Sequence, residues 1–180
     1  FNVPEIMELR SGGHEGIDAP MRPKAPVLHE DARRLVSWTV KQRLVSPAII
    51  GTAMSEFSRR TRRAWATLTE LLQTRGFGSL IKNLAVYPKG LWLGAAAEEM
   101  NVDIMHVHWA APTATMGYVA AALSEIPWII TAHRKDIYAE NLLTVKAQEA
   151  NRIRTISHKG ARDLTRRVQS ESFSPAVIPM

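Results

Sequence analysis

Four short apolar runs between residues 101 and 180 alternate with helix-like segments, and this alternation constrains the fold most strongly. We predict strands over residues 103–109, 127–133, 152–157 and 175–179, separated by helices over 113–124, 139–150 and 159–169. Strands that alternate with helices of about ten residues are typical of βαβ units, which build a parallel sheet through right-handed crossovers. The sequence therefore predicts an α/β fold, a Rossmann-like parallel sheet flanked by helices, with residues 101–180 as its βαβ core.

The first hundred residues show mostly helical patterns, and a basic helical insertion over residues 32–90 stands out within the single domain that we expect for residues 1–180. This segment carries 11 Lys and Arg against 2 Asp and Glu, so it accounts for the whole net charge of +6. Apolar residues recur at spacings of three and four from Ile50 to Leu72, which predicts one helix with an apolar face. The arginines on the opposite face or its flank are Arg59, Arg60, Arg62 and Arg63.

The basic segment predicts either a solvated helix face or a cationic surface for an anionic membrane or another phosphate-bearing partner. We expect no nucleic-acid partner, because the Trp and Phe residues lie on the apolar stripe and offer no stacking platform among the arginines. The absence of Cys excludes a disulfide framework and a thiolate site, and it agrees with a cytoplasmic location. No apolar run approaches the ~20 residues of a spanning helix, so we expect any membrane contact to be peripheral.

Chemically capable side chains follow the first two strands of the predicted sheet. His106 and His108 share one face of the first strand, and His133 and Asp136 follow the second strand. Ligands gather at the carboxyl ends of parallel strands, where the sheet opens onto a crevice. We therefore expect His133 and His108 in a site and favour a core position for His106. For Asp136, a site role and a role as a helix cap are both open.

Four segments of the βαβ core form an ordered set: 103–112, 126–138, 142–150 with Lys146, and 153–157. In order and spacing, this set resembles the acceptor-side domain of retaining glycosyltransferases of family 4, which have the two-domain GT-B fold. Residues 1–10, 13–15 and 21–23 are similar to the segment after the first strand in the colanic-acid, or exopolysaccharide, branch of that family. The resemblance covers most of the chain.

The resemblance also implies parts that this sequence does not show. The family's first strand, with its glycine-rich loop, would precede Phe1, and the C-terminal donor-binding domain would follow Met180. We therefore expect a fragment that is inactive by itself. For the parent enzyme, the resemblance implies retaining transfer of a hexose from a nucleotide sugar to a lipid-linked or polysaccharide acceptor at the inner membrane. The nucleotide sugar is a substrate, and neither a metal nor another cofactor is implied.

Residue roles follow from the same resemblance. The leaving phosphate is expected to help deprotonate the acceptor, so this domain mainly positions the substrates. His133 would face the donor sugar, with its backbone carbonyl available to the developing positive charge, and Asp136 would orient that loop or receive an acceptor hydroxyl. The other expected residues are His108, Trp109, Arg134 and Lys135 for substrate binding and Arg59, Arg60, Arg62 and Arg63 for the membrane or acceptor surface.

Two other functions fit the same residues. A metal-dependent hydrolase holds zinc or iron with a His-x-His strand, and its ligands here would be His106, His108, His133 and Asp136. Such a site usually needs carboxylates from further strands, and residues 152–157 and 175–180 contain none. The other alternative is a non-catalytic interaction or membrane-docking module. Metal analysis and donor-binding calorimetry distinguish the three functions.

Overall fold

A computed structural model describes residues 3–21, 37, 39–139, 141–168 and 173–178. The chain divides into two compact units, Phe1–Ser46 and Pro47–Met180. The first unit contains α1 (Val3–Ser11) and an isolated parallel bridge between Asp18 and Thr39. Every residue expected in the site or on the basic surface belongs to the second unit.

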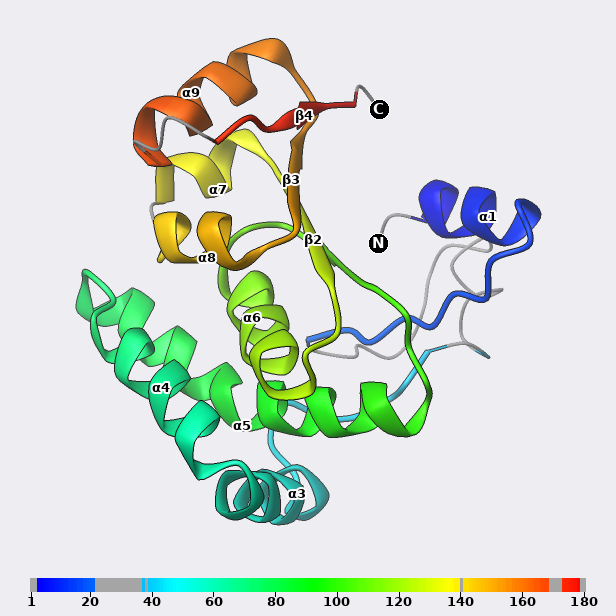
Figure 1. The fold of residues 1–180 in the computed structure, drawn as a ribbon, viewed down its shortest axis with the longest axis vertical. Helices are drawn as coiled ribbons and strands as arrows, with labels where there is room; N and C mark the ends of the chain where they lie inside the picture. Colours follow the sequence, from blue (N-terminus) through cyan, green and yellow to red (C-terminus); the bar gives the residue numbers. More distant parts are fainter. Residues whose placement is uncertain (1–2, 22–36, 38, 140, 169–172, 179–180) are drawn as a thin grey trace. The chain divides into compact units, whose positions relative to one another are not determined.

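A four-stranded parallel sheet lies at the centre of the second unit (Figure 1). Its strands pair in sequence order: β1 (Met105–His108), β2 (Trp128–Ala132), β3 (Arg152–Thr155) and β4 (Ala176–Val177). His108 pairs with Thr131 and Thr131 with Arg154, so the carboxyl ends of the first three strands lie level. The predicted α/β fold with a parallel sheet is confirmed, although each strand is shorter than its apolar run.

Helices connect the strands, and two of the three predicted ones are confirmed. They are α6 (Pro112–Ser124), between β1 and β2, and α9 (His158–Val168), between β3 and β4. The helix predicted over 139–150 is confirmed only in its second part, as α8 (Leu143–Glu149). A further helix that was not predicted, α7 (Arg134–Ala139), follows β2 at once. Leu142 precedes α8 in a left-handed conformation, with φ 51°, which interrupts a continuous helix.

The basic segment of the second unit forms three helices: α3 (Pro47–Arg59), α4 (Thr61–Leu72) and α5 (Phe77–Glu99). The prediction of one continuous helix from Ile50 to Leu72 is wrong. Arg60 leaves the helical conformation, with φ −125° and ψ 40°. The Thr61 hydroxyl donates to the carbonyls of Phe57 and Ser58, both at 3.0 Å, and so takes up acceptors at the end of α3.

Much of the apolar stripe noted in the sequence of α3 and α4 faces solvent, although Phe57 and Leu68 are partly buried and pack against the core. Met54 is 68% exposed and Trp65 is 57% exposed, and Ile50 and Leu72 are also exposed. The residues that α3 and α4 bury in the interior of this unit are mostly smaller: Ile49, Ala53, Ala64, Thr67 and Leu71, together with Glu56. Small side chains at a contact let helix axes approach closely, so the tighter face packs inward and the bulkier one faces solvent.

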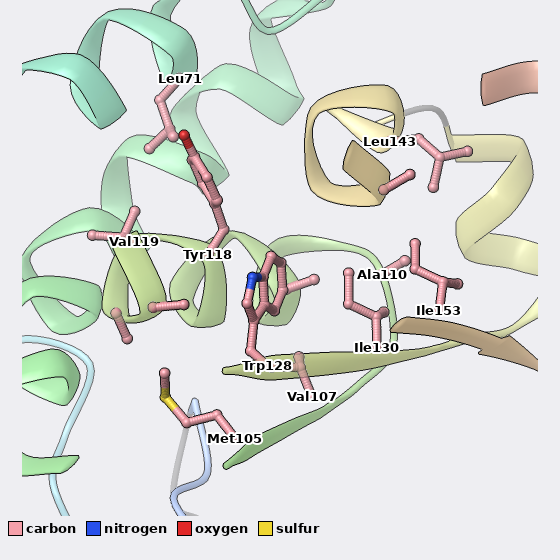
Figure 2. Packing of buried hydrophobic residues seen from close by; sticks show 14 of the residues in the cluster. Leu71, Met105, Val107, Ala110, Tyr118, Val119, Trp128, Ile130, Leu143 and Ile153 are labelled. Atoms are coloured by element: carbon pink, nitrogen blue, oxygen red, sulfur yellow. The ribbon is translucent and has the colours of Figure 1, made fainter. Parts of the chain in front are cut away.

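The core fills the space between the sheet and the helices (Figure 2). Trp128 and Ile130 extend from β2 toward α6, and the Tyr118 ring extends from α6 toward Leu71 (Figure 2). The Trp128 indole Nε1–H donates to the carbonyl of Glu149 at 3.0 Å, so this buried polar group is satisfied. Gly117 lets α6 lie directly on β1. This packing holds β1 and β2 in the positions from which the site is built.

Candidate functional site

Two imidazoles and one indole meet at the carboxyl edge of the sheet. His108 ends β1 and His133 follows β2, and their Nε2 atoms lie 3.1 Å apart. The Trp109 ring centroid lies 6.1 Å from that of His108 and 6.4 Å from that of His133. We call these three residues the His–Trp cluster. The sequence placed all three at this edge, and the register of β1 and β2 brings them together.

The two imidazoles of the His–Trp cluster share a hydrogen bond, which requires one ring nitrogen to donate and the other to accept. If both Nε2 atoms carried a proton, the two N–H groups would repel each other at this distance. The hydrogen bond therefore has a proton on one Nε2 atom and a lone pair on the other. Imidazole nitrogens can donate or accept hydrogen bonds, so the pair can also bind a hydroxyl group at this edge.

Trp109 occupies a backbone conformation that bulky residues rarely adopt, with φ 77°. Its N–H donates to the carbonyl of Thr131 at 2.9 Å, so the chain leaves the sheet at Trp109 itself. The indole is 51% exposed although it touches both histidines. A strained and half-exposed aromatic residue beside titratable groups is a typical feature of a binding site.

Asp136 serves as the cap of α7. Its Oδ2 accepts the backbone N–H of His133 at 3.2 Å. The carbonyl of His133 accepts the N–H groups of Asp136 and Ile137 at 3.0 and 3.1 Å. That carbonyl therefore already accepts two hydrogen bonds within the helix, and its role toward a developing positive charge stays a prediction. Arg134 and Lys135 are exposed in the first turn of α7.

A row of polar side chains crosses the sheet below the His–Trp cluster. His106 Nε2 lies 2.7 Å from the Thr131 hydroxyl, and Arg154 Nε donates to the same hydroxyl at 2.6 Å. The His106 and His108 rings lie 6.0 Å apart, which agrees with their common face. Thr131 and Arg154 were not singled out from the sequence. The sequence feature that could have indicated this row is Arg154, a charged residue inside the short apolar run of β3.

A second group of polar residues is buried behind the site. Asn83 on α5 and Asn141 exchange amide hydrogen bonds of 2.6 and 3.1 Å, and the Thr115 hydroxyl donates to Asn83 at 2.8 Å. Lys146 on α8 lies beside this group and is fully buried. Burial lowers the pKa of Lys146 to about 7, because the loss of hydration outweighs the attraction of Asp136.

The four residues that a metal-dependent hydrolase would use are not gathered around one point. Among the residues that the structure describes, no group of three or more His, Cys, Asp or Glu side chains is arranged to hold a metal ion. The His106 ring bonds to Thr131, and the Asp136 carboxylate bonds to the backbone of His133. Only His108 and His133, of these four, bring ring nitrogens together.

The four arginines expected on one outer surface have different surroundings. The side chain of Arg60 is only 20% exposed and pairs with Glu56 and Glu98, which corrects its assignment to that surface. Arg60 and Arg63 both donate to the carbonyl of Leu123, Arg63 at 3.2 Å. Cations at the carboxyl end of a helix offset its dipole, so this pair stabilises the end of α6. Arg59 and Arg62 are exposed, although Arg59 also pairs with Glu56.

A hollow of about 190 Å³ lies at the opposite end of the strands from the His–Trp cluster. The residues that line it are Tyr118, Ala121, Ala122, Glu125, Ile126, Pro127, Trp128, Glu149 and Asn151. This hollow contains no histidine, and a ligand there would not reach the imidazole pair. The candidate site is therefore the carboxyl edge of the sheet.

Residues 91–166 match the model of the family described as Glycosyl transferase 4-like. The matched segment begins within α5 and ends within α9, so it contains the His–Trp cluster, α7 and Lys146. The match supports a family 4 glycosyltransferase domain, with a sugar donor and an acceptor as the partners of that class. The arginines of α3 and α4 lie outside the matched segment. No curated protein matches the chain.

Proposed function

We propose that this chain provides the acceptor-side domain of a retaining family 4 glycosyltransferase of the colanic-acid or exopolysaccharide type. The reaction moves a hexose from a nucleotide sugar to a lipid-linked or polysaccharide acceptor. The observation that carries the proposal is the His108–His133 pair, at 3.1 Å, on the carboxyl edge of the sheet and inside the segment that matches the family. An acceptor hydroxyl at this edge would find a hydrogen-bond acceptor and an aromatic surface together.

Each residue of the site has a definite task in this proposal. The imidazole pair forms a hydrogen bond with the acceptor hydroxyl and positions it, while the leaving phosphate helps to take up its proton. The exposed indole of Trp109 offers an apolar face with a polar N–H to a pyranose ring. The cations of Arg134 and Lys135 attract phosphate oxygens. Asp136 holds the backbone of His133 through the cap of α7, so it acts as a positioning residue.

A transfer assay tests the proposal. The intact gene product is purified and incubated with UDP- and GDP-linked hexoses and with saccharide or lipid-phosphate acceptors. We expect a glycoside whose anomeric configuration, measured by NMR, equals that of the donor. An inverted product would contradict retention, and no transfer with any pair would contradict the enzymatic proposal. A stoichiometric transition metal in the purified protein would favour the hydrolase instead.

We further propose that α3 and α4 dock the protein, from the cytoplasm, on an anionic membrane. The supporting observation is that these helices expose Met54 and Trp65 while Arg59 and Arg62 remain on the surface. Phe57 and Trp65 meet edge to face at 6.3 Å, so both helices contribute to this apolar surface. Apolar side chains beside arginines suit the boundary between headgroups and acyl chains. No helix among the described residues is long and apolar enough to cross a bilayer.

Sedimentation with anionic and neutral vesicles tests the docking. We expect binding to the anionic vesicles only, weakening as salt rises, because each surface cation contributes on the order of 1 kcal/mol within a Debye length of ~8 Å. The variant Arg59→Ala/Arg62→Ala should lose most of the salt-dependent binding. Trp65→Ala should weaken binding at every salt concentration.

Arg60 and Arg63 are left intact in these variants, because they bond to the carbonyl of Leu123 and their loss would perturb α6. The exposed Arg75, in the turn before α5, provides the control, since Arg75→Ala removes one positive charge outside α3 and α4. Equal sedimentation with both vesicle types would show that the arginines form only a solvated helix face.

A further inference from the structure

The turn between β1 and α6 is strained at Trp109. A left-handed φ of 77° suits glycine, and for a bulky side chain it costs free energy that the surrounding structure must offset. Glycine at this position would remove the strain, yet the chain has a tryptophan whose indole lies against His108 and His133. Some contact must therefore impose the turn on this residue.

The Lys146 amino group bonds to the backbone that directly follows Trp109. Its Nζ donates to the carbonyls of Ala110 at 3.1 Å and Ala111 at 3.2 Å, the two residues that follow Trp109. A third bond, of 2.8 Å, goes to the carbonyl of Asn141. In its protonated form the Lys146 amino group has three N–H donors, and all three are used on carbonyl oxygens. The torsion angles of Ala111, φ −81° and ψ −147°, direct these two consecutive carbonyls to one atom, and the bonds to Nζ fix the backbone that directly follows Trp109.

The position of Lys146 is itself determined by buried neighbours. Asn141, which supplies the third carbonyl, exchanges amide hydrogen bonds with Asn83 on α5. Lys146 is fully buried on α8, so its Nζ has no solvent to turn toward. The buried Nζ therefore has a fixed position, and the carbonyls of Ala110 and Ala111 accept hydrogen bonds from it.

We propose that Lys146 is a positioning residue, which holds the carbonyls of Ala110 and Ala111, imposes the left-handed turn on Trp109 and keeps the indole beside His133. Its N–H groups bond to the backbone of the loop and do not touch a substrate. The proposal about the turn stands on geometry alone. Its consequence for substrate rests on the proposed function, in which the indole meets the acceptor sugar.

The proposal is tested by comparing Trp109→Gly with Trp109→Ala in urea unfolding. Both variants lack the indole, so the difference between them reports the backbone strain at position 109. With Lys146 present, we expect the Trp109→Gly variant to be the more stable one, by roughly tenfold in the unfolding equilibrium constant. In the Lys146→Met background this difference should vanish, because the released loop adopts an ordinary conformation. An undiminished difference in that background would overturn the proposal.

Two further variants complete the test. Lys146→Met leaves three buried carbonyls without a donor, so Lys146→Gln, which keeps two N–H donors, provides a milder form of the same comparison. We expect a reduced difference between the two Trp109 variants in that background, and an unchanged one would again overturn the proposal. Lys82→Met, at an exposed position of α5, is the matched control and should leave the difference intact.

The transfer assay separates this inference from the function on which its consequence rests. If Trp109 meets the acceptor, Trp109→Ala and Lys146→Gln should each raise the acceptor KM about tenfold and change kcat much less. In one outcome, the stability difference between Trp109→Gly and Trp109→Ala disappears without Lys146 while the acceptor KM of Trp109→Ala stays unchanged. That result would establish the role of Lys146 in the turn and overturn the role of Trp109 in substrate binding. A raised KM together with a stability difference that persists without Lys146 would overturn the positioning role of Lys146.

Discussion

His133→Ala is expected to lower turnover in the transfer assay by about 100-fold, because a displacement of the acceptor hydroxyl by about 1 Å can cost that factor. The free energy of unfolding should change by only about 1 kcal/mol, since the ring is half-buried and lies at the edge of the sheet. The measurement pairs kcat with urea unfolding of the same preparation. A large loss of kcat without a loss of stability would assign the effect to chemistry.

The partner ring sharpens this test. If His108 and His133 act as one unit across their 3.1 Å contact, His108→Ala should cost a similar factor, and the double variant should lose little more than either single one. Arg75→Ala, in the exposed turn before α5, serves as the control and should keep full turnover. Near-native turnover of His133→Ala would remove His133 from the site.

Gly117→Val is expected to destabilise the protein by about 3 kcal/mol or more, which is a large fraction of the net stability of a typical domain. A Cβ at Gly117 would lie only 2.4 Å from Val107 Cγ2 on β1, so even Gly117→Ala forces α6 away from the sheet. Val107 is β-branched and cannot turn its methyl group aside without leaving its preferred rotamer. Urea unfolding followed by far-UV circular dichroism measures the loss.

A second glycine provides a control in which substitution should raise the stability instead of lowering it. Gly51 lies inside α3, and a Cβ added to it would meet no atom within 4 Å, so Gly51→Ala should stabilise the protein by about 1 kcal/mol through helix propensity alone. The clash at Gly117 involves Val107 Cγ2, so it should also disappear when that methyl group is removed. Adding Val107→Ala to the Gly117→Ala variant should therefore recover much of the lost stability. An absence of recovery would show that α6 does not lie on β1 as closely as described.

The carboxyl-edge site could be predicted because its residues follow two apolar runs, and level parallel strands bring such positions together. Lys146 entered the sequence argument only through a family resemblance, and its contacts could not be foreseen. A lysine in a helical pattern is ordinarily solvated, and here it is fully buried because three carbonyls from two loops accept its hydrogen bonds. The role of Asp136 as a cap was one of two open alternatives, and its distance to the His133 N–H supports the cap.

The alternation of strands and helices was determined by the sequence alone, because residue periodicity, proline and glycine act within a few positions. Which helix face is buried was decided by the tertiary structure. In α3 and α4 the stripe with Met54 and Trp65 and the stripe with Ala53 and Ala64 both have helical spacing, and only packing inside the unit selects the smaller one. The same holds for the site. His108 meets His133 across 25 residues and Lys146 meets Ala110 across 36, and such contacts depend on how the sheet and helices assemble, not on local preference.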